Sequence, residues 1–217
     1  MVPRDQRVGF LHRAQRARIL AKRYPEAAEA LDFYAEVASF QARRGTSLEL
    51  LKMVSSLGPP LLRQAASGVD VYQAVEMYRS GEDRSSPKSF FARVLLQIEA
   101  ACRDDHAPPQ VGCLRGEGEG SSLWLACSLC FEERRAARSQ CPACQMTDER
   151  QIVVFSASEI PHIEVRACDA CRFYLNVVRL DEEPEAMPDV DEMVAIALDL
   201  RAREMGYEKI QTNLVGM

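Results

Sequence analysis

The chain reads Cys127-Ser-Leu-Cys130, Cys141-Pro-Ala-Cys144 and Cys168-Asp-Ala-Cys171, three Cys-x-x-Cys pairs within one stretch. Such a pair forms a tight turn that directs two thiolates at one ion. Two pairs together complete the tetrahedral four-sulfur site that Zn²⁺ prefers. The stretch therefore predicts a module that depends on metal, and the rest of the chain is interpreted outward from it.

The last two pairs have the spacing of a zinc ribbon. Cys141 and Cys144 would share one ion with Cys168 and Cys171, while the segment between them leaves the metal and returns to it as β-structure. Short β-branched and aromatic runs support this interpretation. They predict strands at Ile152–Phe155, Ile163–Val165 and Phe173–Val178.

The partner of Cys127 and Cys130 is open on spacing alone. Cys102, followed by Asp105 and His106, is a half-site that could complete a mixed ribbon, because carboxylate and imidazole both bind Zn²⁺. Alternatively, Cys102 only ends a helix and this site has decayed. We therefore expect one or two ions per chain.

A third pairing would join Cys127 and Cys130 with Cys141 and Cys144. It would leave the last Cys-x-x-Cys pair without a partner. The insert between these two pairs is also short for a ribbon, which makes this pairing the least favoured of the alternatives.

The composition is that of a globular protein. Of 217 residues, 47% are apolar and 27% are charged, and no run is long and apolar enough to span a membrane. The N-terminus lacks the apolar region of a secretion signal, so we expect a cytoplasmic protein whose cysteines bind metal. The net charge is −5, and Cys102 to Cys171 holds no lysine, so we expect no nucleic-acid partner.

The patterning predicts an α+β fold with an N-terminal all-helical domain at 1–100. A tandem zinc-ribbon module follows at 101–180. Residues 181–217 are predicted to form a linker and a C-terminal helix that packs on the body of the protein. The glycines between 112 and 120 lie in a turn-rich stretch that leads into Leu123–Ala126, a pattern that predicts a β-hairpin arm reaching the Cys127 pair. One helix is expected from Asp189 or Asp191 to Gly206. Helical periodicity covers residues 8–43, with a new start after Pro25, and residues 48–57, 61–66, 69–80 and 88–102.

No enzyme signature is present in the sequence. It contains no phosphate-binding glycine loop and only three histidines, of which His162 is expected at the surface of the ribbon insert. We therefore expect no catalytic residues and no bound organic cofactor.

With these motifs in place, the chain resembles the formate dehydrogenase accessory (formation) proteins of the FdhE type. The resemblance extends over most of the chain, and its cysteine framework is specific. It is carried by Arg16–Leu20, Leu31–Tyr34, Leu125–Cys130 with Glu132, Glu133 and Arg138, Cys141–Cys144, Ala167–Leu175 and Ala197–Tyr207.

Two features depart from the family pattern. Members generally have four Cys-x-x-Cys pairs, and the first would fall here at Cys102–Asp105, where only Cys102 remains. The chain is also shorter than typical members, which suggests a trimmed helical domain.

The resemblance implies a cytoplasmic maturation factor. Such proteins bind the catalytic subunit of a molybdenum or tungsten formate dehydrogenase and assist its assembly. The family's sites are rubredoxin-like and chiefly structural, so iron is the alternative to Zn²⁺. Two other functions remain open from the residues: a redox or metal-exchange protein acting through its Cys-x-x-Cys pairs, and a nucleic-acid-binding zinc ribbon. The oligomeric state is not predicted.

Overall fold

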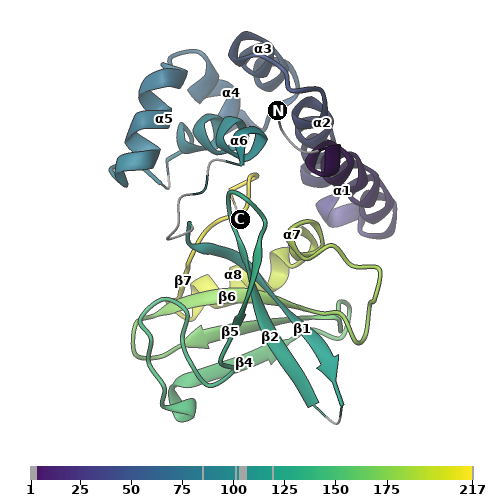
Figure 1. The fold of residues 1–217 in the computed structure, drawn as a ribbon, viewed down its shortest axis with the longest axis vertical. Coiled ribbons are helices and arrows are strands. Elements are labelled where there is room, and N and C mark those ends of the chain that lie inside the picture. The colour runs from purple at the N-terminus through teal and green to yellow at the C-terminus, as the bar shows by residue number, and fades with distance from the viewer. Residues whose placement is uncertain (1–3, 85, 101, 103–106, 119, 217) are drawn as a thin grey trace. The chain divides into compact units, whose positions relative to one another are not determined.

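The computed structural model describes residues 4–84, 86–100, 102, 107–118 and 120–216 (Figure 1). The chain divides into two compact units: Met1–Asp104 with Leu214–Gly216, here called the helical unit, and Asp105–Asn213, here called the sheet unit. Helices followed by a mixed sheet confirm the predicted α+β class. The boundaries at residues 100 and 180 stay predictions, and residues 181–213 lie in the same unit as the sheet.

The helical unit follows the predicted periodicity. Pro25 interrupts the first long helical region, and Gly45 follows its end, as their backbone chemistry favours. Figure 1 shows α1 running alongside α2. The elements are α1 (Arg4–Arg23), η1 (Pro25–Ala27), α2 (Ala28–Arg43), α3 (Ser47–Leu57), α4 (Pro60–Ala66), α5 (Val71–Ser80) and α6 (Ser89–Glu99).

An apolar core that contains buried polar bonds holds the helical unit together. Phe40 of α2 and Phe91 of α6 are fully buried. Gln41 Nε2 donates to Gln97 Oε1 at 2.8 Å and to the Val94 carbonyl at 3.2 Å, which satisfies an amide that burial would otherwise make costly. Thr46 begins α3 with a reciprocal capping box to Glu49.

The sheet unit is built around β6, which pairs on both edges. Its strands have the order β3-β2-β1-β6-β5-β4, and β7 adds to the start of β6. Neighbouring strands are antiparallel except that β1 and β7 run parallel to β6. The strands are β1 (Pro109–Glu117), β2 (Gly120–Cys127), β3 (Glu133–Ala136), β4 (Ile152–Ser156), β5 (Ile163–Cys168), β6 (Phe173–Arg179) and β7 (Glu208–Lys209).

The predicted β-hairpin arm is confirmed, because β1 pairs antiparallel with β2, which leads to Cys127. The glycines of β1 suggested turns, yet Gly112 lies inside the sheet, where an added Cβ would meet Val177 Cγ2 at 3.0 Å and Leu123 Cδ1 at 3.2 Å. Glycine is therefore used here for close packing rather than for a turn. The neighbouring Leu114 and Leu175 complete an apolar cluster with these residues.

The predicted single C-terminal helix is wrong. Residues 188–204 form three short pieces: α7 (Pro188–Asp191), η3 (Glu192–Val194) and α8 (Ile196–Glu204). The break falls at Ala195, whose φ of −82° and ψ of 27° leave the helical range. Asp191, Glu192 and Asp199 on this stretch are buried although they are acidic. Gly206 ends α8 with φ 81°, as expected.

The structure also corrects the placement of His162, which is 3% exposed and not at the surface. Its Nε2 lies 3.8 Å from Asp191 Oδ1, so the side chain faces the α7 region. Across the part of the chain that the structure describes, helices are too short or too polar to cross a bilayer.

Candidate metal centre

All three Cys-x-x-Cys pairs adopt the same backbone turn, and we number these knuckles in chain order. In each, the residue after the second cysteine donates its N–H to the carbonyl of the first cysteine. The bonds are Phe131 to Cys127 at 3.1 Å, Gln145 to Cys141 at 2.9 Å and Arg172 to Cys168 at 2.8 Å. The repeated bond points both thiols of a pair to one side.

The turn requires an unusual conformation at that residue. Phe131, Gln145 and Arg172 have φ values of 61°, 62° and 65°. A positive φ is costly for residues other than glycine, so it persists only where the surroundings enforce it. The first knuckle shares this strained turn with the other two, which argues that it too is shaped for a ligand.

The second and third knuckles bring four sulfur atoms together. Cys141, Cys144, Cys168 and Cys171 place every Sγ within 4.8 Å of the others. Cys141 Sγ lies 3.7 Å from Cys171 Sγ, and Cys144 Sγ lies 3.8 Å from Cys168 Sγ. A tetrahedral ion with Zn–S bonds of about 2.3 Å needs sulfurs about 3.8 Å apart. The group can therefore hold a metal ion of this size without rearrangement.

Burial differs between the four thiols. Cys141 and Cys168 are buried, Cys171 is half-buried and Cys144 is exposed. Loss of solvation raises the pKa of Cys141, and it raises the pKa of Cys171 to about 12, whereas the backbone N–H of Met146 lowers the pKa of Cys144. A metal ion must therefore displace protons from buried thiols, which makes its binding stronger as the pH rises.

A buried guanidinium lies beside the four-cysteine group. Arg166 and Cys168 share one face of β5, and both line a cavity of about 20 Å³ together with Cys141. Arg166 Nη2 donates to the Arg138 carbonyl at 3.0 Å, and its Nε lies 3.8 Å from Glu164 Oε1, but the buried Nε and Nη1 have no hydrogen-bond partner. Four thiolates around a divalent ion leave a net negative charge, which would add to that of Glu164 in balancing this cation. The surroundings thus fit an occupied centre.

A second group contains Cys102, Cys127 and Cys130, whose sulfur atoms also lie within 4.8 Å of one another. Two cysteine groups can therefore hold metal ions. The predicted additional ligands Asp105 and His106 lie outside the described residues. The alternative pairing of the first knuckle with the second is not formed, and the ligand role of each cysteine stays a prediction.

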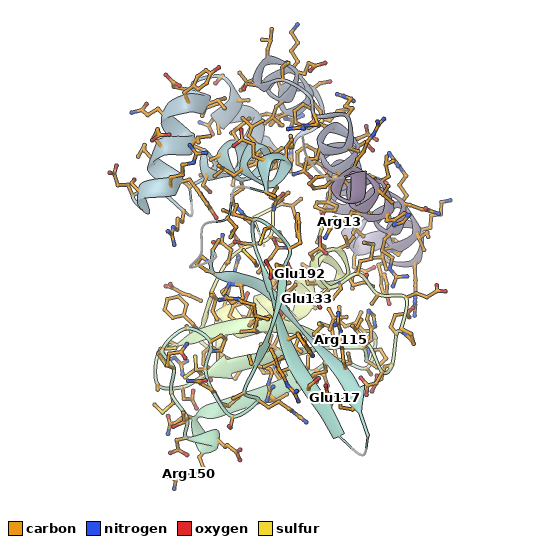
Figure 2. The ribbon with its side chains drawn as sticks, in the orientation of Figure 1. Arg13, Arg115, Glu117, Glu133, Arg150 and Glu192 are labelled. Atoms are coloured by element: carbon orange, nitrogen blue, oxygen red, sulfur yellow. The ribbon has the colours of Figure 1, made fainter. Side chains whose placement is uncertain are left out.

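Cys113 belongs to neither group among the described residues. It is buried in β1, and its thiol lies 3.8 Å from Glu133 Oε1. Burial, then the charge of Glu133, raises the pKa of Cys113 to about 12, so this thiol stays protonated. Glu133 also pairs with Arg115, and both are labelled in Figure 2.

A buried ionic cluster was missed by the sequence reasoning. Lys209 Nζ lies 2.8 Å from Glu192 Oε2 and 3.4 Å from Asp199 Oδ2, and all three side chains are almost fully buried. Gln110 Nε2 donates to Glu192 Oε1 at 2.7 Å, and the Tyr174 hydroxyl donates to Asp199 at 2.9 Å. Glu192 is labelled in Figure 2. No sequence signal marks this cluster, because its members lie on five separate elements.

Comparison with known proteins finds a family match for the segment that contains the four-cysteine group. Residues 139–215 match the family described as "FdhE, C-terminal domain". The match includes the four-cysteine group and the residues that follow it to the end of β7.

Curated relatives agree with this match. The chain is 30% identical over 93 residues to the FdhE homolog of Aquifex aeolicus, covering 43% of this chain and 33% of that protein. It is 29% identical over 121 residues to the FdhE homolog of Pseudomonas putida, covering 54% and 38%. The matched part thus spans only about a third of the length of these relatives.

The fold is also similar to a solved structure. The crystal structure of the FdhE protein from Pseudomonas aeruginosa superimposes with a TM-score of 0.65 at 20% identity. The superposition covers 95% of this chain and 94% of that chain. At this identity, the likeness supports the fold alone.

Proposed function

Because residues 139–215 belong to the FdhE family, we propose that the whole chain is an accessory protein for a formate dehydrogenase. It binds the catalytic subunit of that enzyme in the cytoplasm and assists its maturation, without catalytic activity of its own. The observation that carries the proposal is the family match over the segment that contains the four-cysteine group. The resemblance found in the sequence, which extends to the helical half, supports the same role.

The metal ions in this proposal are structural. Within residues 139–159, Cys141 is the single buried residue, so this segment has almost no apolar core of its own. A metal ion that ties the second knuckle to the third would supply the missing stability. Zn²⁺ fits the sulfur spacing, and iron is the alternative, because four-sulfur geometry alone does not separate the two.

The partner is tested by co-purification. We expect the full chain, tagged and produced in a bacterium that makes a formate dehydrogenase, to recover the catalytic subunit of that enzyme. A Cys113→Ser variant serves as the matched control, because Cys113 lies outside both cysteine groups, and it should recover the same amount. Recovery of nothing above an untagged control, with the subunit confirmed in the lysate, would reject the proposal.

Metal content gives a second expectation. We expect about two metal ions per chain in protein purified without added metal, because two cysteine groups can hold an ion. A Cys127→Ser variant should fall to about one, while Cys113→Ser should keep two. Elemental analysis measures both. One ion in the wild-type protein would mean that the Cys102 group is empty and that Cys127 and Cys130 are free thiols.

A redox or metal-exchange role is the second candidate. The exposure of Cys144 favours it, since a ligand at the surface can be attacked by a thiol or transferred with its metal. Zinc transfer from the loaded chain to an apo-acceptor protein, at a rate above that of free exchange, would support this role over a purely structural one.

A further inference from the structure

The third knuckle makes side-chain contacts that reach beyond the metal centre. Asp169 lies between its two cysteines, and Arg172 follows the second of them. Arg172 Nη1 lies 2.8 Å from Asp169 Oδ1, so the two side chains form one unit on the outer side of the knuckle. Neither can bind the ion in the four-sulfur geometry, yet both are fixed by the same turn.

The Asp169 and Arg172 side chains contact the residues after α8, here called the tail and defined as residues 205–210. The Arg172 guanidinium donates to the carbonyl oxygens of Met205 and Gly206, and its Cζ lies 3.9 Å from the ring centroid of Tyr207. The Tyr207 hydroxyl donates to Asp169 Oδ1 at 2.6 Å. Cation–π stacking and carbonyl capping thus act on the same few residues.

Backbone bonds continue the contact into the sheet. The N–H of Glu208 donates to the Arg172 carbonyl at 2.8 Å, and the N–H of Ile210 donates to the Tyr174 carbonyl at 3.0 Å. These bonds place β7 on β6 and carry Lys209 into its buried ionic cluster. The docking of the tail therefore begins at the knuckle and ends in the core.

A metal ion would add to the bonds that hold the tip of the knuckle. The pairing of β5 with β6 fixes the hairpin as far as Ala167 and Tyr174. Beyond that point, the Arg172 N–H closes the turn on the Cys168 carbonyl, and the Asp169 N–H donates to the Gln151 carbonyl at 2.8 Å. An ion bound by all four cysteines would anchor this tip to the second knuckle, and so fix the position of Asp169 and Arg172.

We propose that Asp169, Arg172 and Tyr207 position the third knuckle for metal, so that metal binding and docking of the tail reinforce each other. The inference rests on metal binding by the four-cysteine group, which belongs to the proposed function. Coupling of this kind is reciprocal: if metal orders the tail, then an intact tail contact must strengthen metal binding by the same factor.

Zinc affinity tests the effect of the tail on the metal. In a Cys130→Ser background, so that the four-cysteine group is measured, Tyr207→Phe is expected to weaken Zn²⁺ binding about 10-fold to 100-fold, as loss of an outer-shell partner does. Competition with a chromophoric chelator gives the value. Tyr78→Phe is the matched control, because Tyr78 is a buried tyrosine of α5 in the helical unit, and its loss of a hydroxyl should leave Zn²⁺ affinity unchanged.

Hydrogen exchange tests the effect of the metal on the tail. Removing Zn²⁺ from the wild-type chain should speed exchange of the Glu208 and Ile210 amides at least about 10-fold. The Arg179 amide, which bonds the His162 carbonyl at the far end of β6, should not change.

Equal Zn²⁺ affinity in the Tyr207→Phe and Tyr78→Phe variants would overturn the inference and leave the proposed metal sites standing. Unchanged exchange of the tail amides on metal removal would do the same. A wild-type chain that binds no Zn²⁺ would instead overturn both the metal sites and the coupling.

Discussion

A Cys141→Ser variant is expected to bind Zn²⁺ at the four-cysteine group more than about 100-fold more weakly than the wild-type chain. Loss of a partner outside the ligand set already costs 10-fold to 100-fold, and loss of a thiolate ligand costs more. Serine keeps the size of the side chain but supplies a hydroxyl, which stays protonated and binds the ion poorly. The expected loss is therefore chemical rather than steric.

The Cys141→Ser substitution should also loosen one defined segment of the sheet unit, residues 139–159. Cys141 is the single buried residue within residues 139–159, so burial adds little to the stability of this segment, and apart from metal its main support is the pairing of β4 with β5. We expect limited proteolysis to cut the variant within this segment, whereas the helical unit stays protected. Chelation of the wild-type chain should give the same cleavage pattern.

Cys113→Ser is the control for this experiment. It also replaces a buried cysteine of the sheet unit, but its thiol lies outside both cysteine groups. It should keep the wild-type Zn²⁺ affinity and proteolytic pattern. Wild-type affinity in Cys141→Ser would refute the assignment of this residue as a ligand.

Replacing Lys209 by methionine is expected to cost about 3–5 kcal/mol in the free energy of unfolding of the sheet unit, the usual cost of removing one partner from a buried ion pair. Methionine fills most of the lysine stem, so packing is largely kept. Two buried carboxylates, those of Glu192 and Asp199, then lose the cation that faces both of them.

The loss in unfolding free energy of the Lys209→Met variant should depend on pH in a defined direction. Burial raises the pKa of Glu192 from 4.5 to about 7, and the Lys209 charge opposes that rise. A raised pKa in the folded state means that stability is present at low pH and is lost as the pH rises through about 7. Without Lys209 the pKa rises further, so Lys209→Met should be less damaging at about pH 5 than at about pH 8.

Urea unfolding followed by the fluorescence of Trp124, the single tryptophan, reports on the sheet unit directly. Lys52→Met, at an exposed lysine of α3, provides the matched control, and comparing variants at each pH removes the pH dependence of metal binding. A loss below about 1 kcal/mol at about pH 8 would show that the cluster contributes no more than a surface pair.

The sequence predicted best where one local pattern decides the structure. The helices of the first hundred residues follow from apolar periodicity, with Pro25 marking a new start that the structure confirms. The strands around the knuckles follow from short β-branched runs. The prediction failed for Gly112, which packs inside the sheet rather than in a turn, and for the C-terminal helix, which breaks at Ala195.

By itself, the sequence determined the turn of each Cys-x-x-Cys pair, because such a pair fixes its own turn within a few residues. Only the tertiary structure decided which pairs come together and what surrounds them: the Arg166 guanidinium beside the four-cysteine group, the contact of Arg172 with Tyr207, and the burial of Lys209 between two carboxylates. The physical reason is range. A turn depends on neighbouring residues, whereas a buried charge can be placed only by the long-range pairing that brings its counter-charges together.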